Sequence, residues 1–89
     1  MNLNYEGYEN YFVGKIYKSK FIQYVFKLEN GYGASVMRGY NANLWELAVI
    51  TWKNNRTSYI DYDTELTDCI LPYLTDEDVR NLLEEIKNL

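Results

Sequence analysis

The chain has 89 residues and a formal net charge of −4, and 47% of its residues are hydrophobic and 25% charged. This length makes one domain with a small core, and no stretch approaches the roughly 18 consecutive apolar residues that a membrane-spanning helix needs. Histidine is absent, which removes the commonest general base and the usual partner of a nucleophilic serine or cysteine. We therefore expect a single domain over residues 1–89 that is neither an enzyme nor a membrane protein.

The cysteine and the acidic stretch predict no catalytic residue, metal ion or cofactor. Cys69 is the single cysteine and lies in an apolar run, so a buried, inert thiol is expected. Asp61 and Asp63 could begin a cation-binding loop, but the loop glycine and the final glutamate of an EF-hand are missing. A polar strand end explains the two aspartates equally simply.

The first half of the chain predicts strands. Residues 1–10 are polar and lack periodicity, which indicates a loosely held arm that docks onto the sheet. Residues 11–18 form the first strand, and Gly14 in its middle predicts a bulge or a close approach by another segment. The first ten residues also lack the positive start and apolar run of a secretory signal, which favours the cytoplasm.

Residues 21–39 have the alternation of a β-hairpin, and Asn30-Gly31 predicts a two-residue turn. That turn sets the register of the two strands. It pairs Tyr24 with Met37, Phe26 with Ser35 and Leu28 with Gly33 on one face. On the other face it places Arg38 opposite Gln23, beside Lys27 and Val25.

Residues 44–52 are the most apolar run and predict a central strand, although Leu44, Leu47, Ala48 and Thr51 also match helical spacing. Residues 53–57 form a polar turn, and residues 58–62 a short edge strand. Residues 64–73 are expected to connect to the last helix and to include a helical turn, which Pro72 separates from that helix.

A capping box, Thr75 with Asp78, begins a C-terminal helix. Its apolar stripe predicts packing on the sheet face that carries Tyr24 and Phe26, and consists of Val79, Leu82, Leu83, Ile86 and Leu89. The expected fold is α+β: an antiparallel meander sheet of four to five strands with a C-terminal amphipathic helix on one face.

Charge is separated along the chain. Residues 11–56 carry seven Lys or Arg residues and two Glu, a local charge of +5, whereas residues 57–89 have a charge of −7. A solvated face is the simplest reading, but such separation can also steer a charged partner.

The chain contains ten tyrosines and two tryptophans, an excess typical of binding surfaces, although half-buried strand positions also favour tyrosine. A sheet face with cations and aromatic rings has the components that hold nucleotides or single-stranded nucleic acids. The predicted binding residues are Lys27, Tyr32, Arg38, Tyr40 and Trp45.

Three segments together resemble a group of small uncharacterised proteins of phages and prophages of Gram-positive bacteria. They are residues 31–36, GYGASV; residues 44–49, LWELAV; and residues 62–64, YDT, followed by residues 74–79, LTDEDV. The resemblance implies a phage-encoded protein in the cytoplasm of a bacterial host cell, where such proteins often bind and disable a host factor. It supplies no catalytic or ligand residues.

The leading hypothesis is a non-enzymatic binding protein that inhibits a host defence or nucleic-acid-processing protein. The alternative is a nucleotide or single-stranded nucleic-acid binder, including a sponge for a signalling nucleotide. A host protein is the expected partner. A homo-oligomer formed through an open edge at residues 11–18 or 58–62 is a further hypothesis.

Overall fold

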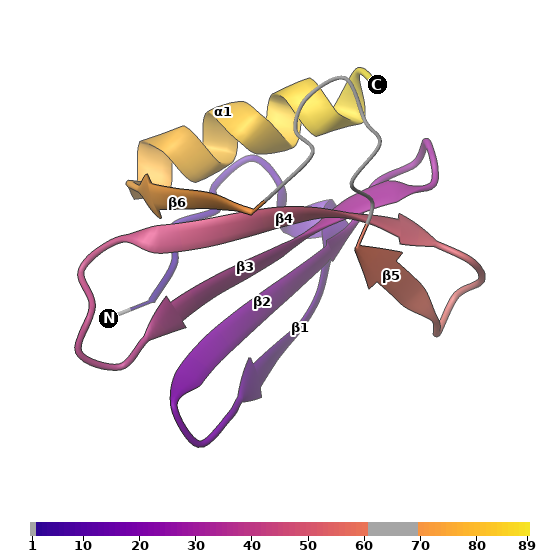
Figure 1. Cartoon of the computed structure of the whole chain (residues 1–89). Coiled ribbons are helices and arrows are strands. Elements are labelled where there is room, and N and C mark those ends of the chain that lie inside the picture. Colours follow the sequence, from indigo (N-terminus) through magenta and orange to yellow (C-terminus); the bar gives the residue numbers. More distant parts are fainter. Residues whose placement is uncertain (1, 61–69) are drawn as a thin grey trace.

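The computed structural model describes residues 2–60 and 70–89, which form a six-stranded antiparallel sheet with one α-helix packed on it (Figure 1). Strands β1 to β4 pair in chain order, and β5 and β6 both pair with β4, β6 along its first half and β5 along its second. The predicted α+β meander is therefore confirmed. The elements are a 3₁₀ helix (Glu9–Tyr11), β1 (Phe12–Tyr17), β2 (Phe21–Lys27), β3 (Tyr32–Gly39), β4 (Trp45–Trp52), β5 (Ser58–Ile60), β6 (Leu71–Leu74) and α1 (Asp76–Lys87).

The structure corrects two expectations about strands. The run at residues 44–52 is the strand β4, so the helical alternative is wrong. The connection before the last helix contains β6, a strand that the sequence reading missed because it is short and holds a proline. The rest of that predicted connection, residues 64–69, lies outside the described residues, as do Asp61 and Tyr62 of the predicted edge strand.

The hairpin between β2 and β3 forms where predicted, but with a different turn. The Leu28 N–H donates to the Tyr32 carbonyl at 2.8 Å, and the Gly31 N–H donates to the Leu28 carbonyl at 3.3 Å. The loop therefore has three residues, 29–31, and Gly31 takes the left-handed φ of 88° that such loops need. The predicted two-residue turn is wrong.

The extra loop residue shifts the register of β3 by one position. Tyr24 pairs with Val36 and Phe26 with Ala34, where the prediction had Met37 and Ser35. A shift of one residue moves every side chain of a strand to the other face of the sheet. Alternation along β3 therefore directs Ala34, Val36 and Arg38 towards α1, and Gly33, Ser35 and Met37 away from it.

Helix α1 begins with the predicted capping box. The Thr75 hydroxyl accepts a hydrogen bond from the Asp78 N–H at 3.1 Å, and the Asp78 carboxylate accepts one from the Thr75 N–H at 3.0 Å. These reciprocal bonds satisfy two backbone donors that the first turn would otherwise leave unpaired.

The apolar stripe of α1 packs on the predicted face. Val79, Leu83 and Ile86 are buried in one cluster with Tyr24 and Phe26 of β2. Ala34 and Val36 fill the space on β3 where the predicted register had placed Gly33 and Ser35.

The N-terminal arm completes this core between α1 and β1. Leu3 is buried, and the ring of Tyr5 stacks on Phe12 with centroids 4.8 Å apart. From the helix, the Arg80 side chain donates to the Asn4 carbonyl at 2.8 Å, and Glu84 accepts from the Tyr8 hydroxyl at 2.9 Å. The arm thus contacts both layers of the fold.

Both long edges of the sheet are irregular. The predicted bulge in β1 is present, because the register with β2 shifts between Phe12 and Gly14. In β6, Trp45 pairs with Leu74 and Leu47 with Leu71, which leaves two residues, 72 and 73, opposite Glu46. Bulges and proline on an edge strand oppose pairing with another strand, so β1 and β6 are poor templates for self-association, whereas the short edge strand β5 pairs with β4 in a regular register.

Candidate functional site

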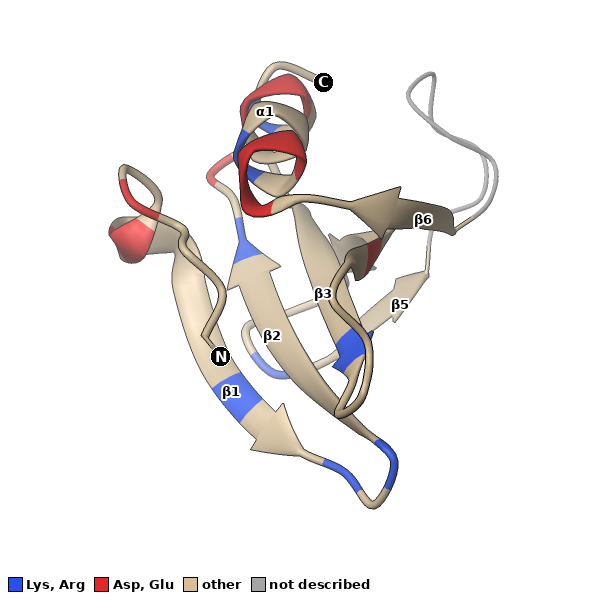
Figure 2. Cartoon of the chain, turned by 90° about the vertical axis from the view of Figure 1, so that its left-hand side faces the viewer, with Lys and Arg blue, Asp and Glu red and all other residues tan. Residues whose placement is uncertain are grey.

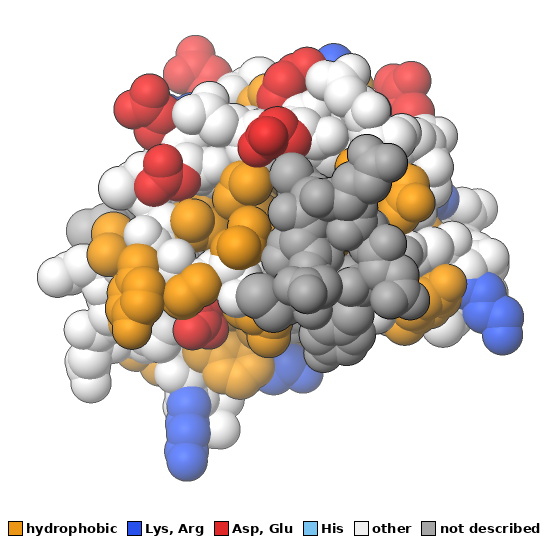
Figure 3. Space-filling model, turned by 45° about the horizontal axis from the view of Figure 1, so that its top comes forward, with side chains coloured by type: hydrophobic (Ala, Val, Ile, Leu, Met, Phe, Trp, Pro, Cys, Tyr) orange, Lys and Arg blue, Asp and Glu red, His pale blue; other side chains and the backbone are white. Residues whose placement is uncertain are grey.

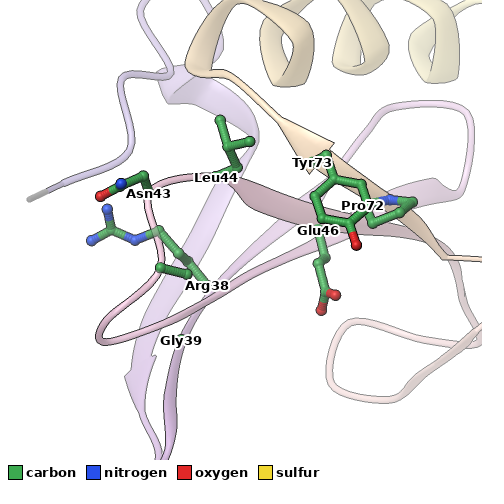
Figure 4. Close-up of a pocket in the computed structure, with 8 residues that line it drawn as sticks. Arg38, Gly39, Asn43, Leu44, Glu46, Pro72 and Tyr73 are labelled. Atoms are coloured by element: carbon green, nitrogen blue, oxygen red, sulfur yellow. The ribbon is translucent and has the colours of Figure 1, made fainter.

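A groove of about 440 Å³ lies at the end of the sheet where β4 begins (Figure 4). Pro72 and Tyr73 of β6 form one side of it, and the other side comes from the end of β3 and from the loop that joins β3 to β4. The residues that line it are Arg38, Gly39, Ala42, Asn43, Leu44, Glu46, Pro72 and Tyr73.

Tyr73 is the most exposed large hydrophobic side chain among the described residues, at 81% of its surface. Its φ of 62° lies in the left-handed region, and among the described residues no other non-glycine residue has a positive φ. This conformation costs an ordinary side chain about 1–3 kcal/mol and is normally given to glycine. The bulge opposite Glu46 explains the φ, but contacts among the described residues do not explain why a large aromatic side chain stands there.

A buried tryptophan, Trp45, lies against Arg38, which lines the groove. The Trp45 indole N–H donates to a carboxylate oxygen of Asp76 at 2.7 Å, which ties the start of β4 to the start of α1. The Arg38 guanidinium lies 4.7 Å from the centre of the Trp45 ring, a cation–π distance, and Arg38 is only 7% exposed. These contacts give the exposed residues around Tyr73 a rigid support.

The surface around Tyr73 is apolar and bordered by acidic side chains. Leu44 and Ile70 are also exposed, and Figure 3 shows apolar side chains gathered on the side of the molecule where β6 lies, with acidic side chains of α1 above them. The first turn of α1, residues 76–78, is entirely acidic and begins three positions after Tyr73. We call the exposed side chains of Leu44, Glu46, Pro72 and Tyr73 the Tyr73 surface.

The charge separation in the sequence becomes a separation in space. In Figure 2 most acidic residues lie on α1 and on the N-terminal arm, whereas most basic residues lie along the strands and in the turns below. Two carboxylates on α1 are stabilised in their charged form. Hydrogen bonds from the backbone and the hydroxyl of Thr75 lower the pKa of Asp78, and the hydrogen bond from the Tyr8 hydroxyl lowers the pKa of Glu84.

The five predicted binding residues do not share one surface. Arg38 lines the groove, and the buried Trp45 ring lies 4.7 Å from its guanidinium. Tyr40 is half exposed, and its hydroxyl donates to a carbonyl in the turn between β1 and β2. Tyr32 packs against the core. Lys27 lies on the opposite face of the sheet, so the predicted pairing of Lys27 with Arg38 on one face is wrong.

The sequence reading missed Tyr73 and Leu44 as candidate residues. The apolar run at residues 70–74 signals a strand, which would have placed an exposed tyrosine on a sheet edge. The positive φ of Tyr73 has no sequence signal, because it depends on how β6 pairs with β4.

In the two described stretches, no three Cys, Asp or Glu side chains gather closely enough to hold a metal ion. Asp61, Asp63 and Cys69 lie outside these stretches. Among the residues described, no helix is long and apolar enough to cross a membrane.

Comparisons of the chain with models of protein families, with curated proteins and with solved structures found no match, so the function has to be argued from the geometry above.

Proposed function

We propose that this protein is a small, non-enzymatic binding protein that uses the Tyr73 surface to inhibit a host protein. The resemblance to phage and prophage proteins of Gram-positive bacteria supports a location in the cytoplasm of a bacterial host cell. Its target there is a defence protein or a nucleic-acid-processing protein. The matching surface on that target offers an apolar pocket for the tyrosine ring, with basic residues around it.

The observation that carries this proposal is the strained, exposed Tyr73. A glycine at this position would avoid the cost of the left-handed φ, so the tyrosine is best explained by a use outside the fold. Tyrosine is enriched among the residues that dominate binding energy, because its ring buries a large area and loses little conformational entropy. The Trp45–Asp76 bond ties the start of β4 to the start of α1, so the backbone that carries the ring is fixed before binding, which lowers the entropic cost of association.

The alternative, nucleotide binding through the predicted residues, has less support. Lys27 and Arg38 lie on opposite faces, and Arg38 is buried beside Trp45. A single nucleotide could not contact both side chains and also stack on Tyr32, which packs against the core.

The proposal can be tested with one target-finding step and one measurement of affinity. Immobilised protein is exposed to the cytoplasm of a Gram-positive host, and retained proteins are identified by mass spectrometry. Purified candidates are then titrated with wild-type protein and with Tyr73→Asn, since asparagine tolerates the left-handed φ and removes the ring. We expect Tyr73→Asn to weaken binding at least tenfold, as truncation of an interface anchor does.

Tyr17→Thr is the matched control. Tyr17 is 68% exposed and lies on β1, at the other edge of the sheet, and threonine suits a strand. This variant should bind the target as the wild type does. A target that binds the wild type and Tyr73→Asn equally well would contradict the proposal, and so would a host cytoplasm from which nothing specific is retained.

A further inference from the structure

Trp52, at the far end of β4 from the groove, lies flat across the face of the sheet opposite α1. Its indole N–H donates to the Phe26 carbonyl on β2 at 3.1 Å, so the ring spans β3 to reach β2. Gly33 of β3 makes this possible, because a Cβ there would lie 2.6 Å from the indole nitrogen. The sheet thus holds an aromatic ring in a fixed orientation, with its position set by a glycine and a hydrogen bond.

One cation contacts this ring, and two more belong to the neighbouring loop. The Lys27 ammonium lies 5.8 Å from the ring centre and donates a hydrogen bond to Asn55 in the loop between β4 and β5. Lys53 and Arg56 belong to the same loop, two positions before and one position after Asn55. The loop is ordered internally, since the Lys53 N–H donates to the Thr57 carbonyl at 2.8 Å.

Glu29, two positions from Lys27, is hydrogen-bonded to a residue of the core face. It lies in the loop between β2 and β3 and accepts a hydrogen bond from the Tyr11 hydroxyl at 3.4 Å, and Tyr11 packs on the core face. Lys27 at the indole face and the two cations of the loop that it contacts add positive charge at this end of the sheet, on a protein whose net charge is −4. This combination suits a ligand that has a flat ring and negative charge.

We propose that this end of the sheet binds a nucleobase that carries phosphate, with the base stacked on Trp52 and the phosphate held by Lys27, Lys53 and Arg56. Base stacking on an aromatic ring with phosphate contacts from lysine and arginine is how proteins hold single-stranded nucleic acids. This set of residues shares only Lys27 with the set that the sequence predicted.

The site is independent of the Tyr73 surface. Tyr73 lies beside Glu46, and six residues of extended strand separate Glu46 from Trp52, a distance of about 20 Å. Binding at Trp52 can therefore be present or absent whatever the result of the host-protein experiment.

Binding is measured with two probes at low salt, because the same chemistry can come from a free nucleotide or from a strand. A fluorescein-labelled oligothymidine of about 12 nucleotides is followed by fluorescence anisotropy, and unlabelled AMP by calorimetry. For the oligonucleotide, contacts to the phosphates from up to three cations predict a slope of log affinity against log salt of about −2. Binding of AMP as tight as that of the oligonucleotide identifies a nucleotide site, and much tighter binding of the oligonucleotide identifies a strand site.

Charge-matched variants distinguish binding at this site from non-specific electrostatic attraction between the oligonucleotide and any basic residue. Lys53→Gln with Arg56→Gln removes two cations from the loop between β4 and β5, and Lys18→Gln with Lys20→Gln removes two cations from the turn between β1 and β2. We expect the first pair to weaken oligonucleotide binding about tenfold and to flatten the salt slope, and the second pair to change neither. Equal losses from both pairs would overturn the proposal, as would no binding of either probe at 50 mM salt.

Trp52 is tested with two substitutions, since one of them can disturb the fold. Trp52→Phe keeps an aromatic face and should retain most of the affinity, whereas Trp52→Leu should weaken binding about tenfold. Circular dichroism checks that each variant is folded. Pyrophosphate that competes as well as AMP at equal concentration would show that no base is recognised and would overturn the stacking role of Trp52.

Discussion

Gly33 is the position where a single added methyl group should disturb this fold most. A Cβ at residue 33 would lie 2.1 Å from the Phe26 carbonyl oxygen and 2.6 Å from the Trp52 indole nitrogen. Neither contact is tolerable, and the first involves backbone, which cannot rotate away. Gly33→Ala must therefore push β3 away from β2 and displace the Trp52 ring.

The size of the effect follows from three terms. Overpacking in a well-packed region costs about 1–3 kcal/mol. Loss of the Trp52–Phe26 hydrogen bond adds about 1 kcal/mol. Replacing glycine in a strand returns about 0.5–1 kcal/mol by reducing the entropy of the unfolded chain. The net loss should be about 1–3.5 kcal/mol, which lowers the Tm of a domain of this size by roughly 5–25 °C.

Urea denaturation followed by circular dichroism measures this loss. Gly14→Ala is the matched control, because Gly14 lies in β1, has no heavy atom within 4 Å of its built Cβ and does not have a positive φ. It should be neutral or slightly stabilising. If Gly33→Ala unfolds within about 0.5 kcal/mol of the wild type, the close contact of Trp52 with β3 is wrong.

Four further outcomes follow from the same geometry. Tyr73→Gly should be about 1 kcal/mol more stable than Tyr73→Ala in urea, because both remove the ring and only glycine relieves the left-handed φ. Thr75→Ala should lower the free energy of unfolding by about 1 kcal/mol through loss of the cap; an unchanged value would contradict the bond to Asp78. The lowered pKa of Asp78 stabilises the fold above the pKa of an unfolded aspartate, and this contribution is lost as the pH falls through the folded pKa. Thermal melts at pH 7 and pH 3 should therefore show a smaller acid-induced loss for Asp78→Asn than for the wild type. Light scattering after gel filtration should give one species of 10.6 kDa, because the edge strands β1 and β6 are bulged; a dimer would show that these bulges do not block pairing.

The sequence did not determine which side chains share a surface. Aromatic excess and charge separation suggested a binding surface, but the residues chosen from the sequence lie on both faces of the sheet. Arg38 was assigned to the wrong face through the register of β3, and Tyr73 was not considered because its exposure depends on the pairing of β6 with β4. Trp52 was passed over because only the fold brings it across Gly33 to the Phe26 carbonyl.

Local patterns along the chain were enough for the strand meander, the bulge at Gly14, the capped helix and the face that the helix covers. Each of these depends on neighbours in sequence: alternation, a helical stripe, and hydrogen bonds that span three residues. The register of β3 and the path of β6 needed the folded molecule. The loop after Leu28 holds three residues instead of two, and Asn30 in that loop donates to the Ile86 carbonyl near the end of α1 at 2.8 Å. Contacts between residues so far apart in the sequence leave no periodic pattern in it. A register shift of one residue nevertheless exchanges the two faces of a strand.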